Sequence, residues 1–223
     1  SILTSSLGKT ARIWSSDVAS APRILSGHKD KVWHAAWSPD GSRVATASAD
    51  GTALVWRVAG AEPPLVFSGH EDEVFHIAWS FDGKRVATAS SDGTARVWSL
   101  SGRQAPIVLS GHAEQVASVQ FDSSGTRVLT ASCDGTARLW RLDGRSAPKV
   151  FERLAGDLAF ARLSSNGELL ALGAESGEIS ICDVSGHNER LVSSAQDAKL
   201  TGMDWISHSQ LVATFEDGRV LVL

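Results

Sequence analysis

A repeat of 42 residues dominates this chain. One copy runs from Ser68 to Trp98 and reads SGHEDEVFHIAWSFDGKRVATASSDGTARVW, and it recurs from Ser26 to Trp56 and from Ser110 to Trp140. A Gly-His pair, an Asp-Gly pair and a closing tryptophan stay in register through these copies. A unit of this size cannot bury both of its faces alone, so neighbouring copies must stack. The repeat therefore limits the fold to a radial propeller or a linear solenoid.

Short runs of β-branched, aromatic and small residues alternate with turn signals inside each copy. In the first complete copy, Pro39-Asp40-Gly41 and Asp50-Gly51 separate such runs. This pattern is typical of antiparallel strands joined by tight hairpins. The sequence therefore predicts four strands and no helix in each repeat.

The order of these features resembles the WD-repeat β-propeller family over nearly the whole chain. Gly-His, Trp-Ser-Pro-Asp-Gly, a Ser/Thr-rich strand, Asp-Gly-Thr and a terminal tryptophan follow one another, although the tryptophans are not followed by the family's aspartate. The resemblance implies an all-β fold, a β-propeller built of four-stranded antiparallel WD-repeat blades. About five to six blades are represented, and the first and last are incomplete.

We expect a single WD-repeat propeller region over residues 1–223. The predicted parts are a partial blade at 1–26, blades at about 27–67, 69–109, 111–151 and 153–193, and an incomplete last blade at 195–223. Propellers of this family close by pairing strands from the two chain ends, which hides the sheet edges. The incomplete blades would leave a gap, so self-association to complete the propeller is one expectation. The chain also begins in mid-pattern, which indicates a piece of a longer protein.

A histidine, a threonine, an aspartate and a tryptophan recur together in three copies. A histidine, an aspartate and a hydroxyl also compose a nucleophilic triad, but such a triad is needed only once per site. The resemblance implies a buried hydrogen-bond network instead, in which imidazole, carboxylate and indole satisfy one another. We interpret the sets as structural, and they are His28, Thr46, Asp50 and Trp56; His70, Thr88, Asp92 and Trp98; and His112, Thr130, Asp134 and Trp140.

In the fourth repeat these anchors are lost. Leu154, Ser176 and Cys182 stand at the histidine, aspartate and tryptophan positions. Two further histidines, His34 and His76, occupy equivalent positions, but no zinc-ligand spacing surrounds them. No glycine-rich phosphate loop precedes a helix. We therefore expect no catalytic residue, no metal and no cofactor.

Composition narrows the classes of partner. The formal net charge of −4 lacks the broad positive field of sequence-independent nucleic-acid binding. No apolar run approaches the roughly 20 residues that cross a bilayer, and no signal peptide is visible. Two cysteines at unrelated repeat positions do not form a disulfide framework, which favours a cytoplasmic location. We expect no nucleic acid and no membrane among the partners.

The resemblance places partner docking on the narrow upper face, formed by residues after Gly-His and at the start of the inner strand. Trp33 and Phe75 share one such position, where later copies have alanine or threonine. Aromatic side chains flanked by charge are typical of binding hot spots. The alternatives are that both rings pack between blades, and that the lysines and glutamates pair across the blade boundary. The candidate residues are Lys29, Lys31, Trp33, Glu71, Glu73, Phe75, Gln115, Asp157 and Lys199.

The leading hypothesis is a non-enzymatic protein-protein interaction scaffold or sensor module that docks a protein or peptide on this face. The amino-acid sequence of the repeats also resembles that of WD-repeat regions in bacterial multidomain proteins. One alternative is a small-ligand or enzymatic site in the central channel, which fold alone does not exclude. Another is a recently duplicated structural module without a dedicated site.

Overall fold

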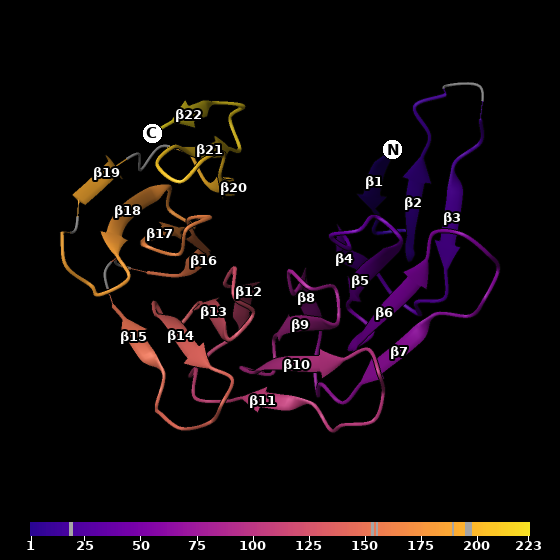
Figure 1. Ribbon diagram of the computed structural model, residues 1–223. Coiled ribbons are helices and arrows are strands. Elements are labelled where there is room, and N and C mark those ends of the chain that lie inside the picture. Colours follow the sequence, from indigo (N-terminus) through magenta and orange to yellow (C-terminus); the bar gives the residue numbers. More distant parts are fainter. Residues whose placement is uncertain (18–19, 153, 155, 189, 195–197) are drawn as a thin grey trace. The chain divides into compact units, whose positions relative to one another are not determined.

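The computed structural model describes residues 1–17, 20–152, 154, 156–188, 190–194 and 198–223. Within these residues the regular structure is entirely β and forms six antiparallel sheets of three or four strands (Figure 1). No helix long and apolar enough to cross a membrane occurs in this described part. The chain divides into two compact units, Ser1–Ser110 and Gly111–Leu223.

The first unit contains one three-stranded and two four-stranded sheets. In each sheet, strands that are consecutive in sequence pair with each other. Its strands are β1 (Ile2–Ser5), β2 (Thr10–Trp14) and β3 (Arg23–Ser26); β4 (Val32–Trp37), β5 (Arg43–Ser48), β6 (Thr52–Arg57) and β7 (Leu65–Ser68); and β8 (Val74–Trp79), β9 (Arg85–Ser90), β10 (Ala95–Ser99) and β11 (Ile107–Leu109).

The second unit repeats this organisation with two four-stranded sheets and one of three strands. The predicted start of the last blade, at residue 195, lies outside the described residues. The strands of the second unit are β12 (Val116–Phe121), β13 (Arg127–Ser132), β14 (Ala137–Arg141) and β15 (Lys149–Phe151); β16 (Leu158–Leu163), β17 (Leu169–Ala174), β18 (Glu178–Asp183) and β19 (Arg190–Ser194); and β20 (Leu200–Trp205), β21 (Leu211–Phe215) and β22 (Val220–Val222).

The Asp-Gly-Thr signal forms the hairpin between the second and third strands of a blade. Gly51 has a φ of 78°, a left-handed conformation that a side chain disfavours. Asp50 accepts hydrogen bonds at Oδ1 from the backbone nitrogen and the hydroxyl of Thr52, at 3.0 and 2.6 Å. The turn is therefore specified by its own three residues.

The core of each unit lies between successive sheets. In the first unit, Ala45 and Val55 of one sheet contact Ile77 and Val86 of the next, and all four side chains are buried. In the second unit, a corresponding layer joins β17 and β18 to β20 and β21, and Leu211 is fully buried in it. Small side chains on one sheet and larger ones on the next allow the faces to approach closely.

The inner strand of each of five sheets carries an irregularity at the same place. In β4, Val32 pairs with Ser48 and His34 with Ala47, so Trp33 is an extra residue without a register partner. The same shift occurs between Val74 and His76, which makes Phe75 the extra residue of β8. Such bulges bend a strand and redirect a side chain. The first two bulges therefore present an aromatic ring each.

Candidate functional site

The recurring polar residues meet at one end of each complete blade of the first three repeats. In the blade of β8 to β11, His70 Nδ1 lies 2.8 Å from Asp92 Oδ2, and His70 Nε2 lies 2.7 Å from Thr88 Oγ1. The indole nitrogen of Trp98 donates to the same hydroxyl at 2.9 Å. Residues that are up to 28 positions apart in sequence thus form one chain of hydrogen bonds.

The other two copies repeat this geometry. His28 contacts Asp50 at 3.0 Å and Thr46 at 2.7 Å, and Trp56 donates to Thr46 at 3.0 Å. The corresponding distances around His112, to Asp134, Thr130 and on to Trp140, are 2.9, 2.7 and 2.9 Å. A remnant survives in the first sheet, where Trp14 donates to Thr4 at 2.9 Å without a histidine or aspartate.

The protons in this chain have one consistent arrangement. An ionised carboxylate only accepts, so His70 must donate through Nδ1 to Asp92, and in the neutral ring Nε2 then accepts from Thr88. Burial lowers the pKa of His70 below 6.5, against the opposing effect of Asp92. Burial alone would raise the pKa of Asp92, but hydrogen bonds from Thr94 and His70 outweigh it and lower the pKa to about 2. A neutral imidazole therefore faces a carboxylate.

Access decides what this constellation can do chemically. The hydroxyls of Thr46, Thr88 and Thr130 belong to residues with no exposed surface, and each already bonds a histidine and a tryptophan. A nucleophile must reach a substrate carbonyl. These hydroxyls are therefore poorly suited to catalysis and well suited to joining the second and third strands of a blade to the segment that precedes its inner strand.

The fourth repeat replaces the whole set rather than one member. Leu172 stands at the threonine position, and it is fully buried in a cluster with Cys182, with Leu154 packed against them. Removing both partners of a buried hydrogen bond costs far less than removing one. Because the polar residues are replaced together, no buried polar group of the set is left without a hydrogen-bond partner. Leu172 thus belongs with Leu154, Ser176 and Cys182 as a replacement of the network residues.

The candidate docking residues lie at the same end of the strands as Asp50 and Asp92. Trp33 and Phe75 are half-buried, and their ring centroids are 5.9 Å apart. Trp33 donates its indole hydrogen to Glu73 Oε2 at 2.8 Å, and the ammonium of Lys31 lies 5.4 Å from the centre of the Trp33 ring. We name Lys31, Trp33, Glu73 and Phe75 the aromatic cluster.

The predicted charge pairs take a different form. In the described part of the chain, the structure records no ion pair between Lys29 or Lys31 and Glu71 or Glu73. Instead, the backbone nitrogens of Lys29 and Glu71 donate to Asp50 and Asp92, at 2.7 and 3.1 Å. These bonds hold the segment after each Gly-His pair against its blade and leave both side chains exposed.

The three candidates of the second unit are exposed and make their own contacts. Gln115 donates to the sulfur of Cys133 at 3.1 Å. Lys199 pairs with Glu175 at 2.5 Å, and the carbonyl of Asp157 accepts from the backbone nitrogen of Glu175 at 2.9 Å. No aromatic side chain accompanies them at the bulge position, which holds Ala117, Ala159 and Thr201.

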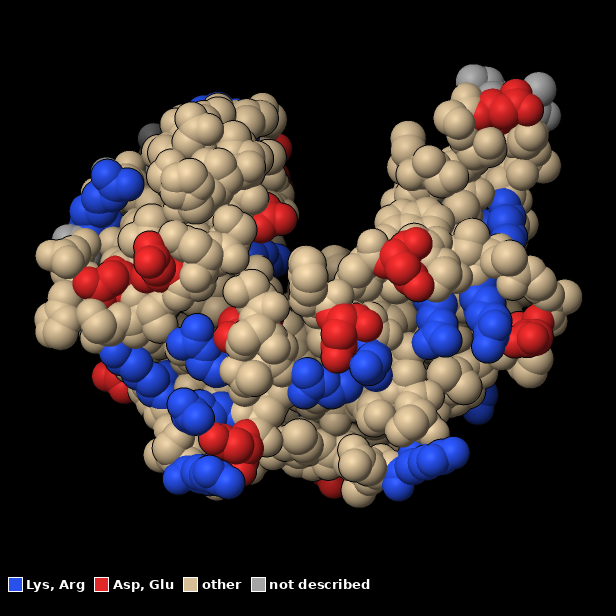
Figure 2. All heavy atoms as spheres, viewed as in Figure 1, with Lys and Arg blue, Asp and Glu red and all other residues tan. Residues whose placement is uncertain are grey.

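Charges of both signs occur together on the face that Figure 2 draws. Figure 2 shows lysine and arginine side chains interspersed with aspartate and glutamate on the face in view. On the inner strands β4 and β8, the rings of His34 and His76 stack with centroids 4.0 Å apart.

The described residues contain no group of three or more side chains placed to hold a metal ion.

The comparison with protein families identifies the repeats. The WD40 description (WD domain, G-beta repeat) matches residues 20–57, 61–99 and 104–141, which together make up just over half of the chain. The chain belongs to the WD40 repeat family. Its six sheets are blades of WD40 type, and the matches stop where the histidine, aspartate and tryptophan anchors stop, although β16 to β22 keep the strand order. A comparison with curated proteins found no match.

Proposed function

We propose that this WD40 protein is a non-enzymatic docking scaffold that binds a protein or peptide partner through the aromatic cluster. WD40 repeats generally mediate protein-protein interaction. The observation that carries the proposal is the position of Trp33 and Phe75 on equivalent bulges of neighbouring blades. A bulge is a device that aims a side chain, and here it aims two large rings at one spot.

The anchored state of Trp33 supports this assignment. Its hydrogen bond to Glu73 and its contact with Lys31 fix the indole before a partner arrives. A ring that is already ordered loses little conformational entropy on binding. Exposed charges of both signs around it, on Lys29, Lys31 and Glu71, would orient the partner.

The alternatives have less support in the described residues. A small-ligand or enzymatic site would need ionisable groups that converge on one place. The recurrent His, Thr and Asp residues instead form hydrogen bonds with one another inside the blades. A duplicated module without a site would not require aromatic rings at two bulges and small side chains at the others. We keep cytoplasmic location, a bacterial parent and self-association as predictions.

Photocrosslinking tests the docking site directly. We would place p-benzoylphenylalanine at Phe75 and, as a matched control in the same unit, at Val66, which is 61 % exposed on β7. Irradiation in lysate of the source cells is expected to give a discrete protein adduct from position 75 and none of that mass from position 66. Equal adducts at both positions, or none at position 75, would overturn the proposal.

A further inference from the structure

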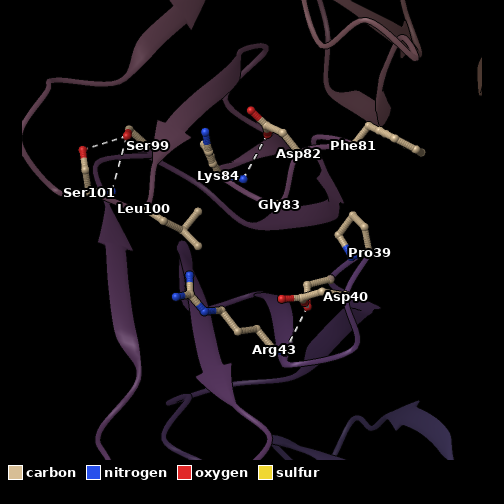
Figure 3. Close-up of a pocket in the computed structure, with 11 residues that line it drawn as sticks. Pro39, Asp40, Arg43, Phe81, Asp82, Gly83, Lys84, Ser99, Leu100 and Ser101 are labelled. Atoms are coloured by element: carbon tan, nitrogen blue, oxygen red, sulfur yellow. Dashed lines mark hydrogen bonds between the residues drawn. The ribbon is translucent and has the colours of Figure 1, made fainter.

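A second candidate surface lies at the opposite ends of the strands in the first unit. Three turns meet there: the β4 to β5 turn, the β8 to β9 turn and the turn that follows β10. They enclose a cleft of about 460 Å³, drawn in Figure 3. The aromatic cluster lies at the other ends of β4 and β8, so this cleft is a separate site. We name it the turn cleft.

The turn cleft contains one large apolar side chain that the fold does not use. Phe81 is 76 % exposed, and the same place in the other repeats holds Pro39, Ser123 and Ser165. A serine or proline therefore suffices to build the turn. Figure 3 shows Pro39 on the same side of the cleft as Phe81, with Leu100 on the opposite side.

Two cations of the turn cleft make no direct side-chain contact with a carboxylate in the described residues, although Lys84 and Asp82 attract each other at longer range. The described residues provide no hydrogen bond or ion pair to the guanidinium of Arg43 or the ammonium of Lys84. Leu100 lies between these two side chains in Figure 3. The wall formed by Arg43, Leu100 and Lys84 thus combines an apolar centre with two available cations.

The two carboxylates of the turn cleft are engaged by their own turns. Asp40 accepts from the hydroxyls of Ser38 and Ser42 at 2.6 and 2.7 Å, and these bonds lower its pKa to about 2. Asp82 accepts from the hydroxyl of Ser80 and the backbone nitrogen of Lys84, at 2.6 and 3.0 Å. Both oxygens of Asp40 and Oδ1 of Asp82 are therefore engaged by the turns, whereas the side chains of Arg43 and Lys84 offer donors that make no recorded hydrogen bond in the described residues.

The exposure of the lining indicates the kind of ligand. A pocket for a small molecule buries most of that molecule's surface. Here Pro39, Phe81 and Lys84 are all exposed, so the turn cleft would cover one side of a ligand only. An extended peptide, which continues along the surface beyond the cleft, fits this arrangement. The positive charges of Arg43 and Lys84 equal in number the negative charges of the two aspartates in the lining. The cleft therefore lacks the net positive charge that would favour a polyanion.

We propose that the turn cleft binds a linear segment of a partner protein in which an aspartate or glutamate side chain adjoins an apolar side chain. The carboxylate is placed to accept hydrogen bonds from Arg43, whose planar guanidinium suits bidentate pairing, with Lys84 adding charge. The apolar side chain covers Leu100 and contacts Pro39 or Phe81. The carboxylate thus meets two cations that make no direct contact with a carboxylate in the described residues, and the apolar side chain meets the exposed ring of Phe81.

An array of amidated heptapeptides tests this specificity. All twenty residue types would be combined at the two central positions, with glycine and serine elsewhere, and probed with the labelled full chain. Binding is expected for pairs of an apolar residue with aspartate or glutamate. It should fall at least about tenfold when asparagine or glutamine replaces the acid, because the charge-assisted bonds to Arg43 are lost.

Substitutions of the residues that line the turn cleft test whether the selected peptides bind there. Arg43→Gln and Lys84→Gln should each reduce binding of the selected peptides at least about fivefold, and Phe81→Ser, which introduces the residue of the next repeat, should reduce it while the thermal midpoint stays unchanged. Val66→Ala, at an exposed position outside the turn cleft and the aromatic cluster, is the control and should bind as the parent does. Absence of any acidic and apolar pair, or equal binding by Arg43→Gln, would overturn the proposal. So would tighter binding of a labelled RNA dodecamer that depends on Arg43.

Discussion

Trp33 donates its indole hydrogen to Glu73 across the boundary between two neighbouring blades, at 2.8 Å. The bond links a bulge residue of β4 to the residue just before β8. Packing between blades and partial exposure to solvent are therefore compatible for one ring. One edge of the indole is fixed by Glu73, while the side chain as a whole stays only half-buried.

A double-mutant cycle measures this bond. Trp33→Phe keeps an aromatic ring and removes the donor, and Glu73→Gln removes the charge of the acceptor. We expect a coupling free energy of about 1 kcal/mol in urea unfolding, since a hydrogen bond to a charged group at a partly exposed site contributes about that much. Strictly additive effects of the two substitutions would show that the contact does not stabilise the blade boundary.

Thr88 is the member of its network that bonds two partners at once. Thr88→Val keeps the shape and leaves both His70 and Trp98 without their hydroxyl partner. The free energy of unfolding should fall by about 1–3 kcal/mol, the cost of buried polar groups left unsatisfied. Thr88→Ser is the control, because it retains the hydroxyl, and it should lose less. A Val variant as stable as the parent would contradict the structural interpretation.

Leu172 provides the reciprocal substitution. In the fourth repeat no histidine or tryptophan occupies the network positions, so Leu172→Thr would bury a hydroxyl among apolar side chains and also leave a cavity. We expect a loss of about 2–4 kcal/mol in urea unfolding, larger than that of Thr88→Ser. An unchanged unfolding midpoint would mean that the polar and apolar versions of the network are interchangeable one residue at a time.

Acid should destabilise the fold in two stages. Burial lowers the pKa of His28, His70 and His112 below 6.5, so the unfolded chain binds protons there that the folded chain resists. Their contribution is complete above about pH 6.5 and declines as the pH falls below that value. A second decline follows below about pH 3.8, where Asp92, with its pKa of about 2, stays ionised only in the folded state.

Urea unfolding at pH 7.5 and pH 5.5 checks the first stage. The midpoint should be lower at pH 5.5, and the difference should shrink in His70→Gln, which removes one titrating ring. A higher midpoint at pH 5.5 would show that the imidazoles are protonated in the folded state and would reverse the proton assignment.

The glycine of the Gly-His pair is required by geometry at Gly69 and Gly111. Gly69 has a φ of 142°, and a Cβ there would lie 2.7 Å from Nη1 of Arg96. Gly111 has the same conformation and would meet Arg138 at 2.6 Å. Gly69→Ala should therefore lower the free energy of unfolding by more than about 1 kcal/mol. The exposed Gly102→Ala, with open space around it and a φ of 65°, should lose less, because the left-handed region near 65° admits a side chain more readily than a φ of 142° does.

The sequence was sufficient to predict the strands and turns because the repeat presents each element several times. Hydrophobic alternation and Asp-Gly turns recur every 42 residues, and the observed strands follow them into the fourth and fifth repeats, where the anchors are gone. The identity of the polar sets was also visible, since His70, Thr88, Asp92 and Trp98 recur as a group. Repetition therefore supplied the information that a single copy lacks.

The sequence did not indicate the bulges or the turn cleft. A bulge is a property of strand pairing. Nothing in the amino-acid sequence around Trp33 shows that Val32 and His34 pair with consecutive residues of β5. The acceptor of the Trp33 hydrogen bond was equally hidden, because Glu73 lies 40 positions away and a salt bridge to lysine was the competing expectation. The one usable signal was Phe81, an aromatic residue in a turn where the other copies have serine or proline.

The affinity of the partner captured at position 75 tests the docking claim most directly. Dissociation constants would be measured by titration calorimetry for the parent, for Trp33→Ala and Phe75→Ala, and for Val66→Ala, an exposed apolar residue outside the cluster. We predict that each aromatic variant binds at least about tenfold more weakly while remaining folded, as hot-spot residues do, and that Val66→Ala binds as the parent does. Unchanged affinity in both folded aromatic variants would contradict the account.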